Sequence, residues 1–135
     1  IKDVEKKIGE LNPSIIYTHH SSDLNIDHQI VHNAVITACR PFPDQLIKKI
    51  LTFEVQSSTD WQVQSPNKSF HPNYYVDISK HLDSKLSALK AYSIEMMPWP
   101  HSRSIKANNY LARWRGSNVG LDAAEAFQLI RIIEK

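Results

Sequence analysis

The fold of this chain is decided by residues 14–39, SIIYTHHSSDLNIDHQIVHNAVITAC. Residues 14–19 begin with a continuous apolar run, which predicts a short strand buried on both faces, as in a parallel sheet. Residues 20–26 form a polar loop. Asp27 is a plausible N-cap for a helix that continues to about Cys39. The expected apolar stripe of this helix has helical spacing and comprises Ile30, Val31, Ala34, Val35 and Ala38.

Regular elements are also expected on either side of this segment. Residues 3–11 have helical spacing of apolar side chains, and Asn12-Pro13 is expected to end that helix. Residues 49–56 alternate between polar and apolar side chains and predict a strand. Residues 74–78 predict another short strand, after a long polar loop over residues 57–71.

The last third of the chain is expected to be mainly helical. Ser79 is the expected cap of a helix over residues 80–97, which Pro98 and Pro100 close. Ser102 or Ser104 is expected to cap a further helix that runs to about Arg115, with Gly116 as its C′ residue. The pattern over residues 124–133 does not distinguish a helix from a strand.

Helices that alternate with short buried strands indicate an α/β fold, with a Rossmann-like, mainly parallel sheet flanked by helices. The 135 residues fit a single domain, 1–135. Only one amphipathic helix precedes the strand at residues 14–19, so we expect the sheet to lack its first strand or strands. The first residue is Ile1 rather than Met, which suggests that the chain begins downstream of its natural start.

Composition narrows the classes of function. The chain is 41% hydrophobic and 22% charged, with a net charge of +2, and its basic residues lack the density of a nucleic-acid patch. No apolar run approaches the roughly 20 residues of a membrane span, and no signal peptide is present. The single cysteine, Cys39, excludes an internal disulfide and fits a cytoplasmic protein with a buried structural thiol.

Two histidines and an aspartate at the start of the predicted helix are candidate site residues. His28 and His32 are four residues apart and share a helical face, a spacing with which two imidazoles can hold zinc. No glutamate follows His28, so this pair alone is a weak signal. Asp27 is either only a helix cap or also orients a neighbouring imidazole or metal ligand. His101 lies in a polar loop and, taken alone, is only weak evidence for a functional site.

Residues 23–32, DLNIDHQIVH, resemble the second motif of the PIG-L/LmbE-like zinc-dependent N-deacetylases. The resemblance spans nearly the whole chain in order. Its further segments are Ala38-Cys39-Arg40-Pro41, Phe53-Glu54-Val55, Ser57-Ser58-Thr59-Asp60-Trp61, Val76-Asp77-Ile78, Lys85, Ala88-Leu89, Tyr92, His101-Ser102-Arg103-Ser104, Arg115-Gly116 and Ala124-Glu125-Ala126-Phe127.

This resemblance implies a Rossmann-like hydrolase that removes the acetyl group from an N-acetylated amino sugar, such as N-acetylglucosamine, or from its conjugate. Members hold zinc with two histidines and an aspartate. Two of these ligands and the general base come from an Ala-His-Pro-Asp-Asp-Glu motif that this chain lacks. By resemblance, His28 is the third zinc ligand and Asp27 is the aspartate beside it.

One position departs from the family pattern. Many members have an oxyanion-stabilising histidine three residues before the zinc histidine, where this chain has Asn25. Asparagine can donate a hydrogen bond but cannot carry a proton. His101 is therefore a candidate to face the substrate in its place.

We therefore expect an incomplete portion of a zinc-dependent N-deacetylase, which by itself binds zinc poorly and has little activity. The alternative is a non-catalytic carbohydrate-binding or interaction module derived from the same fold. A zinc-binding module that uses His28 and His32 with His19 or His20 is a further alternative. A sheet that lacks strands exposes an unpaired edge, so oligomerisation or other association through that edge is expected.

Overall fold

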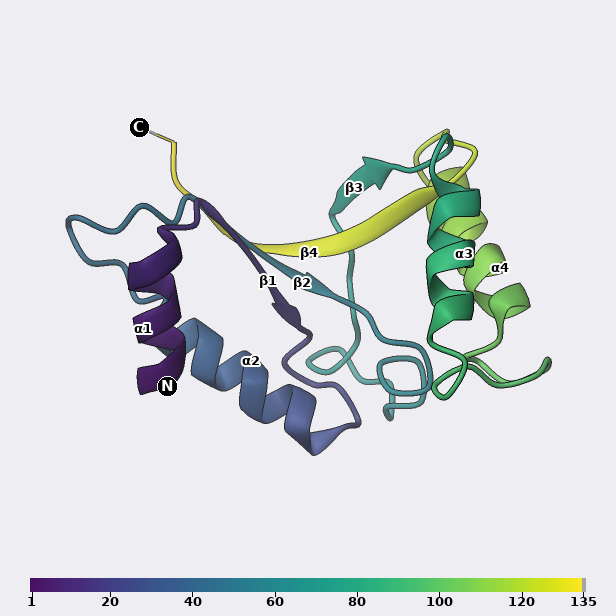
Figure 1. The fold of residues 1–135 in the computed structure, drawn as a ribbon, viewed down its shortest axis with the longest axis horizontal. Helices are drawn as coiled ribbons and strands as arrows, with labels where there is room; N and C mark the ends of the chain where they lie inside the picture. The colour runs from purple at the N-terminus through teal and green to yellow at the C-terminus, as the bar shows by residue number, and fades with distance from the viewer. Residues whose placement is uncertain (135) are drawn as a thin grey trace. The chain divides into compact units, whose positions relative to one another are not determined.

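The structure is a computed structural model that describes residues 1–134. Its elements follow one another along the chain (Figure 1), and β4 is the long strand near the C-terminus. They are α1 (Lys2–Leu11), β1 (Ile15–His19), α2 (Ile26–Ala38), β2 (Lys49–Phe53), β3 (Tyr74–Asp77), α3 (Leu82–Ala91), α4 (Ile105–Ser117) and β4 (Ala124–Ile132). Among these elements, no helix combines the length and apolar character that a membrane span requires.

The α/β class expected from the sequence, with helices flanking a sheet, is confirmed. The strand order is β1-β2-β4-β3. β1 and β2 pair in parallel, with Ile16 opposite Ile50, whereas β2 and β4 pair antiparallel. The sheet is therefore mixed. The undecided segment at residues 124–133 is a strand, because its backbone pairs with β2.

The residues divide into two compact units. The first comprises Ile1–His71 and the chain from Phe127 onwards, and the second comprises Pro72–Ala126. The strand β4 begins in the second unit and continues in the first.

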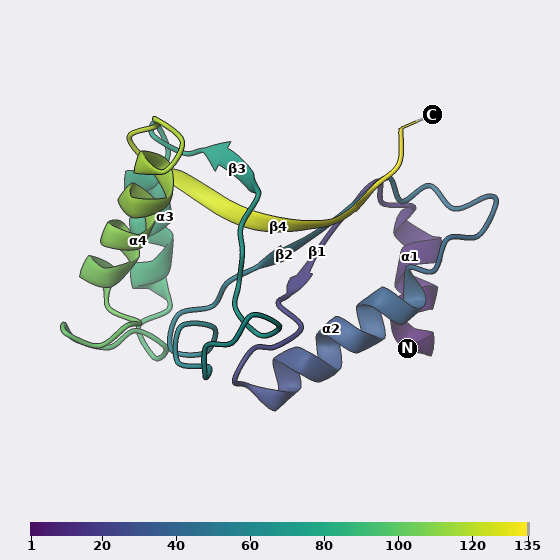
Figure 2. The same cartoon turned by 180° about the vertical axis from the view of Figure 1, so that it is seen from behind.

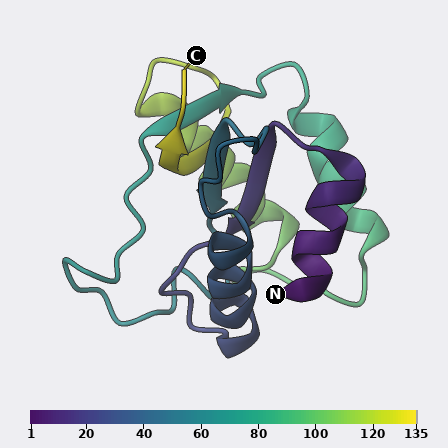
Figure 3. The same ribbon diagram turned by 90° about the vertical axis from the view of Figure 1, so that its left-hand side faces the viewer.

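In the first unit, α1 and α2 pack on the same face of β1 and β2 (Figure 3). The buried centre of this layer is formed by Cys39, Ile47 and Ile50, with Ile8 and Ile16 packed against it. β2 lies between two strands, so its side chains are the most deeply buried, and Leu51 has no exposed surface. Burial raises the pKa of the Cys39 thiol, which agrees with a structural thiol.

In the second unit, α3 and α4 lie side by side (Figure 2). Their small core joins Ile78, Leu82, Ala112 and Ala123, with Leu86 partly buried against it. The peptide bond between Trp99 and Pro100, in the loop before α4, is cis.

Two helix caps differ from those expected. Asn25, rather than Asp27, caps α2: its side-chain oxygen accepts from the backbone N–H of Asp27 at 2.9 Å. Ser79 does not cap α3, which begins after His81. The Ser79 hydroxyl instead donates to Asp77 and accepts from the backbone N–H of Ala123, so it ties the end of β3 to the chain before β4.

The ends of the two late helices also differ from those expected. α3 ends at Ala91 because the chain turns there, with the Tyr92 N–H bonded to the Leu89 carbonyl. Ser104 caps α4 as one of the two expected residues. Gly116 lies within α4 instead of at C′, because the helix approaches the backbone of residues 121–123 there.

Candidate functional site

The candidate site lies where β1 ends, on the loop that leads into α2. His19 is the last residue of β1, and Asn25 starts the helix that carries His28 and His32. Side chains outside the carboxyl ends of strands are the usual binding groups of α/β sheets. The strand β1 and the helix α2 therefore bring three histidines, His19, His28 and His32, to one end of the sheet.

His28 is held by a buried carboxylate. Its Nδ1 is 3.0 Å from Oδ2 of Asp23, whose side chain is fully buried, while the His28 side chain is 20% exposed. A carboxylate accepts hydrogen bonds, so the imidazole N–H donates. The other ring nitrogen, Nε2, is then available to a ligand. This is the arrangement in which protein carboxylates orient metal-binding histidines.

His19 stacks on His28. The two ring centroids are 4.0 Å apart and their planes differ by 22°, and Phe53 packs on His19 at a centroid distance of 4.8 Å. Burial is the main cause that lowers the pKa of His19. The neighbouring His28 and His32 lower this pKa further, against the opposing effect of Asp23. These influences favour a neutral His19 beside His28.

His32 does not join His28 in a shared pair. Its ring is buried, and Nδ1 donates to the backbone carbonyl of His19 at 2.8 Å. His20 is also buried, with Nε2 3.1 Å from the carbonyl oxygen of Lys68. Across residues 1–134, no three His, Cys, Asp or Glu side chains are grouped to hold a metal ion. Although His28 and His32 share a helical spacing, their Nδ1 atoms are bonded to different groups, the Asp23 carboxylate and the His19 carbonyl.

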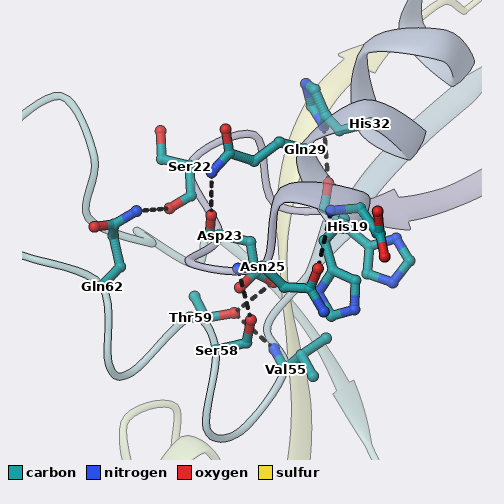
Figure 4. A network of polar contacts seen from close by, with 12 residues as sticks. His19, Ser22, Asp23, Asn25, Gln29, His32, Val55, Ser58, Thr59 and Gln62 are labelled. Carbon is teal, nitrogen blue, oxygen red and sulfur yellow. Dashed lines mark hydrogen bonds and ion pairs between the residues drawn. The ribbon is translucent and has the colours of Figure 1, made fainter.

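The loop after β2 packs against the candidate site through polar contacts (Figure 4). The Thr59 hydroxyl donates to Asp23 Oδ2 at 3.3 Å and accepts from the backbone N–H of Val55 at 2.7 Å. The Ser58 hydroxyl accepts from the backbone N–H of Asn25 at 3.2 Å. Ser58 and Thr59 are buried. The loop after β2 therefore holds the carboxylate of Asp23, which lies on the loop after the neighbouring strand β1.

Asn25 and Asp27 lie at the exposed start of α2. The Asn25 carboxamide oxygen is occupied by the cap, so its N–H groups are the donors that it can offer. Asp27 is an acidic residue in the first turn of α2, where a negative charge is favourable. The carboxylate bonded to His28 comes from Asp23, four residues earlier than Asp27.

His101 belongs to the second compact unit, whereas His28 belongs to the first. His101 is half-buried, and its Nδ1 accepts from the backbone N–H of Arg103 at 3.0 Å. A neutral imidazole that accepts at Nδ1 carries its hydrogen on Nε2. His101 therefore has a hydrogen-bond donor at Nε2.

Asp23, Ser58 and Thr59 are site residues that the sequence analysis did not identify as such. Asp23 lies in a polar loop and has no periodic pattern that marks it as buried. The family resemblance nevertheless offered a signal for all three, since Asp23 begins the motif at residues 23–32 and Ser58 and Thr59 fall within the segment at residues 57–61.

No family model matches the sequence, and no curated protein matches it. Solved structures do match. The conserved protein TT1542 from Thermus thermophilus has a TM-score of 0.71 and 18% identity, over 98% of this chain and 59% of its own. GalB, the 4-carboxy-2-hydroxymuconate hydratase from Pseudomonas putida, has a TM-score of 0.69 and 17% identity, over 98% and 59%.

The N,N′-diacetylchitobiose deacetylase from Pyrococcus horikoshii, in complex with an inhibitor, has a TM-score of 0.71 and 16% identity. The match covers 96% of this chain and 50% of the deacetylase. The chain thus spans between half and three-fifths of the length of these three proteins. At such low identity, the likeness establishes the shared fold and leaves the chemistry to be argued from the site.

Proposed function

We propose that this chain is part of a zinc-dependent hydrolase that removes the N-acetyl group from an amino sugar or its conjugate. The observation that carries the proposal is the Asp23–His28 pair at 3.0 Å, in which a buried carboxylate holds an imidazole at the carboxyl end of a strand. The deacetylase among the structural neighbours supports an N-acetylated sugar as the substrate class.

The donor chemistry of the site fits a zinc ion in part. His28 supplies a nitrogen ligand with a carboxylate partner behind it, as zinc-binding histidines usually have. Within residues 1–134 no second and third ligand accompany it. The remaining two ligands are proposed to come from a segment with the Ala-His-Pro-Asp-Asp-Glu motif.

Zinc, when bound, would polarise the amide carbonyl and activate a water molecule. Residues of this chain are proposed to assist that chemistry by stabilising charge near the reacting amide. Asn25 is proposed to stabilise the negative oxygen of the tetrahedral intermediate through the N–H groups of its side chain, and His101 is the alternative candidate for that role. One such donor contributes roughly 3–4 kcal/mol to the transition state. Asp27 is proposed to supply negative charge beside His28.

The fold by itself does not select this chemistry, because a hydratase shares it at a similar TM-score. The proposal of a deacetylase therefore depends on His28 and its surrounding motif. A hydratase assay therefore distinguishes the two chemistries.

The test measures zinc content and acetate release from N-acetylglucosamine and N,N′-diacetylchitobiose. Both are measured on the 135-residue chain alone and on the natural polypeptide that carries these residues. We expect little zinc or turnover in the chain alone, and zinc with turnover in the natural polypeptide. His28→Ala removes a ligand, so zinc affinity should fall by more than the roughly 10–100-fold typical of losing an orienting residue.

The matched control is His71→Ala, which removes an exposed histidine of the same compact unit and should change neither reading. His101→Ala should retain zinc and lower kcat by about 100- to 1,000-fold. Acetate release that His28→Ala leaves unchanged, or hydratase activity without acetate release, would refute the proposal. About one zinc per chain in the isolated polypeptide, lost in His28→Ala, would favour a local histidine site instead.

A further inference from the structure

Asp23 is a buried carboxylate whose burial the stability of the fold does not explain. Its side chain has no exposed surface, and only Oδ2 is bonded, to His28 and to Thr59. Within residues 1–134, Oδ1 is buried without a hydrogen-bond partner. A buried carboxylate with an unfilled acceptor is unfavourable for folding, so its presence points to a role in the site.

We infer that Asp23 is the positioning residue of the candidate site, an inference that rests on the function proposed above. It holds His28 in the tautomer that carries hydrogen on Nδ1, which leaves the lone pair of Nε2 for the metal ion. The chemistry is direct: a carboxylate has no hydrogen to donate, so the 3.0 Å contact requires one on Nδ1. A neutral imidazole has only one such hydrogen.

The loop after β2 fixes the position of Asp23 itself. Thr59 donates to the same oxygen that His28 bonds, and the Ser58 hydroxyl accepts from the backbone of Asn25, two residues beyond Asp23. The side chain of Gln29 donates to the Asp23 backbone carbonyl from α2. Thr59 therefore holds the Asp23 carboxylate while Gln29 holds its backbone, so two separate segments fix the direction of the carboxylate toward His28.

Stacking supplies the second constraint on His28. The Asp23 carboxylate fixes which edge of the His28 ring faces it. The stacked His19 ring, with its centroid 4.0 Å from that of His28, fixes the plane of the His28 ring. Together these contacts set both the tautomer and the orientation of His28 before any ligand arrives. Residues that hold a metal ligand in place raise metal affinity through such preorganisation.

The experiment is nitrogen-15 NMR of the imidazoles in the metal-free 135-residue chain, at about pH 8, above the ordinary histidine pKa. In the wild type we expect His28 to carry hydrogen on Nδ1. Asp23→Asn, which preserves shape, and Asp23→Ala, which removes the acceptor, should both shift His28 toward the Nε2–H tautomer. The shift should be larger in Asp23→Ala.

His32 provides the internal control, because its Nδ1–H is bonded to the His19 carbonyl and not to a carboxylate. Its tautomer should be unchanged in both variants, which also reports that the fold is intact. An unchanged His28 tautomer in Asp23→Ala, with the His32 signal intact, would overturn the inference. An Nε2–H tautomer in the wild type would also overturn it.

A zinc titration of the natural polypeptide separates this inference from the proposed function. Asp23→Asn should weaken zinc binding by about 10–100-fold. If the wild-type polypeptide binds no zinc while the His28 tautomer depends on Asp23, the proposed function fails and the positioning role stands. If zinc binds equally well in the wild type and in Asp23→Ala, the proposed function stands and the positioning role is wrong.

Discussion

At the scale of single residues, His19 makes the stability of the first unit sensitive to mild acid. Its pKa is lowered in the folded protein, chiefly by burial and then by His28, from the ordinary value of 6.5. Below that value the unfolded chain binds more protons than the folded one, so the free energy of unfolding falls as pH decreases. This loss continues until the pH passes the lowered pKa.

Urea unfolding between about pH 8 and about pH 5 measures this effect, with a slope of at most about 1.4 kcal/mol per pH unit from one group. His19→Phe is the comparison variant, because phenylalanine retains an aromatic ring but does not titrate. Its free energy of unfolding should depend less steeply on pH than that of the wild type. Equal slopes would contradict the assignment to His19.

Ser57 stores backbone strain beside the site. Its φ is 64°, in the left-handed region, which costs a residue other than glycine roughly 1–2 kcal/mol. Ser57→Gly relieves this strain but increases the freedom of the unfolded chain, so a net gain in stability of up to about 1 kcal/mol is expected. Denaturant unfolding measures it.

Ser57→Ala is the matched control, since it removes the same hydroxyl and keeps the Cβ atom. The glycine variant should be the more stable of the two. A glycine variant that is no more stable than the alanine variant would show that the turn carries no appreciable strain.

The sequence predicted some residues of the site better than others. The position of His28 at the start of a helix after a strand is confirmed, because strand and helix both have local patterns. The partner of His28 was missed, since its burial depends on Ser58 and Thr59, which are more than thirty residues away in the chain. The proposed roles of Asn25, Asp27 and His101 stay predictions.

At the scale of elements, Gly116 marks the close approach of α4 to the segment before β4. A Cβ atom there would lie 2.7 Å from the backbone oxygen of Leu121 and 2.8 Å from the Cα of Ala123. Backbone cannot move aside as a flexible side chain can. Gly116→Ala should therefore lower the free energy of unfolding by roughly 1–3 kcal/mol.

Gly9→Ala, in α1, is the control for this substitution. No atom lies within 4 Å of the Cβ that it adds, and alanine is favoured over glycine in helices by about 1 kcal/mol. Thermal or denaturant unfolding should show opposite signs for the two variants. Stabilisation by both would contradict the close packing of α4.

Most helices were predictable because apolar periodicity reflects burial on one face, whereas β1 was predicted from an apolar run whose expected burial on both faces is wrong, since Ile15 and Tyr17 are exposed. The strand β1 and the helices α1, α2 and α4 lie close to the expected residues. Caps were less predictable, since several polar residues compete at each helix start. Asn25 caps α2 in place of Asp27 because its side chain accepts from the backbone N–H of Asp27. Ser79 does not cap α3 because its hydroxyl is bonded to Asp77 and to the backbone of Ala123.

At the scale of the whole molecule, the α/β class followed from the alternation of helices with short apolar strands. The antiparallel pairing of β4 did not, because its sequence left even the choice between helix and strand open. One boundary between the two compact units lies at the end of the long polar loop over residues 57–71, but the other lies inside β4, where no linker or composition change marks it. Such a division depends on which distant segments meet, and a single sequence does not reveal that.

The interrupted first unit has a consequence for synthesis on the ribosome. β2 acquires its second neighbour only when residues 127–132 of β4 have emerged, after the whole of Pro72–Ala126. At about 5–20 residues per second, that interval lasts for seconds. The later unit can therefore fold before the earlier one is complete, and the second edge of β2 stays unpaired until residues 127–132 have emerged.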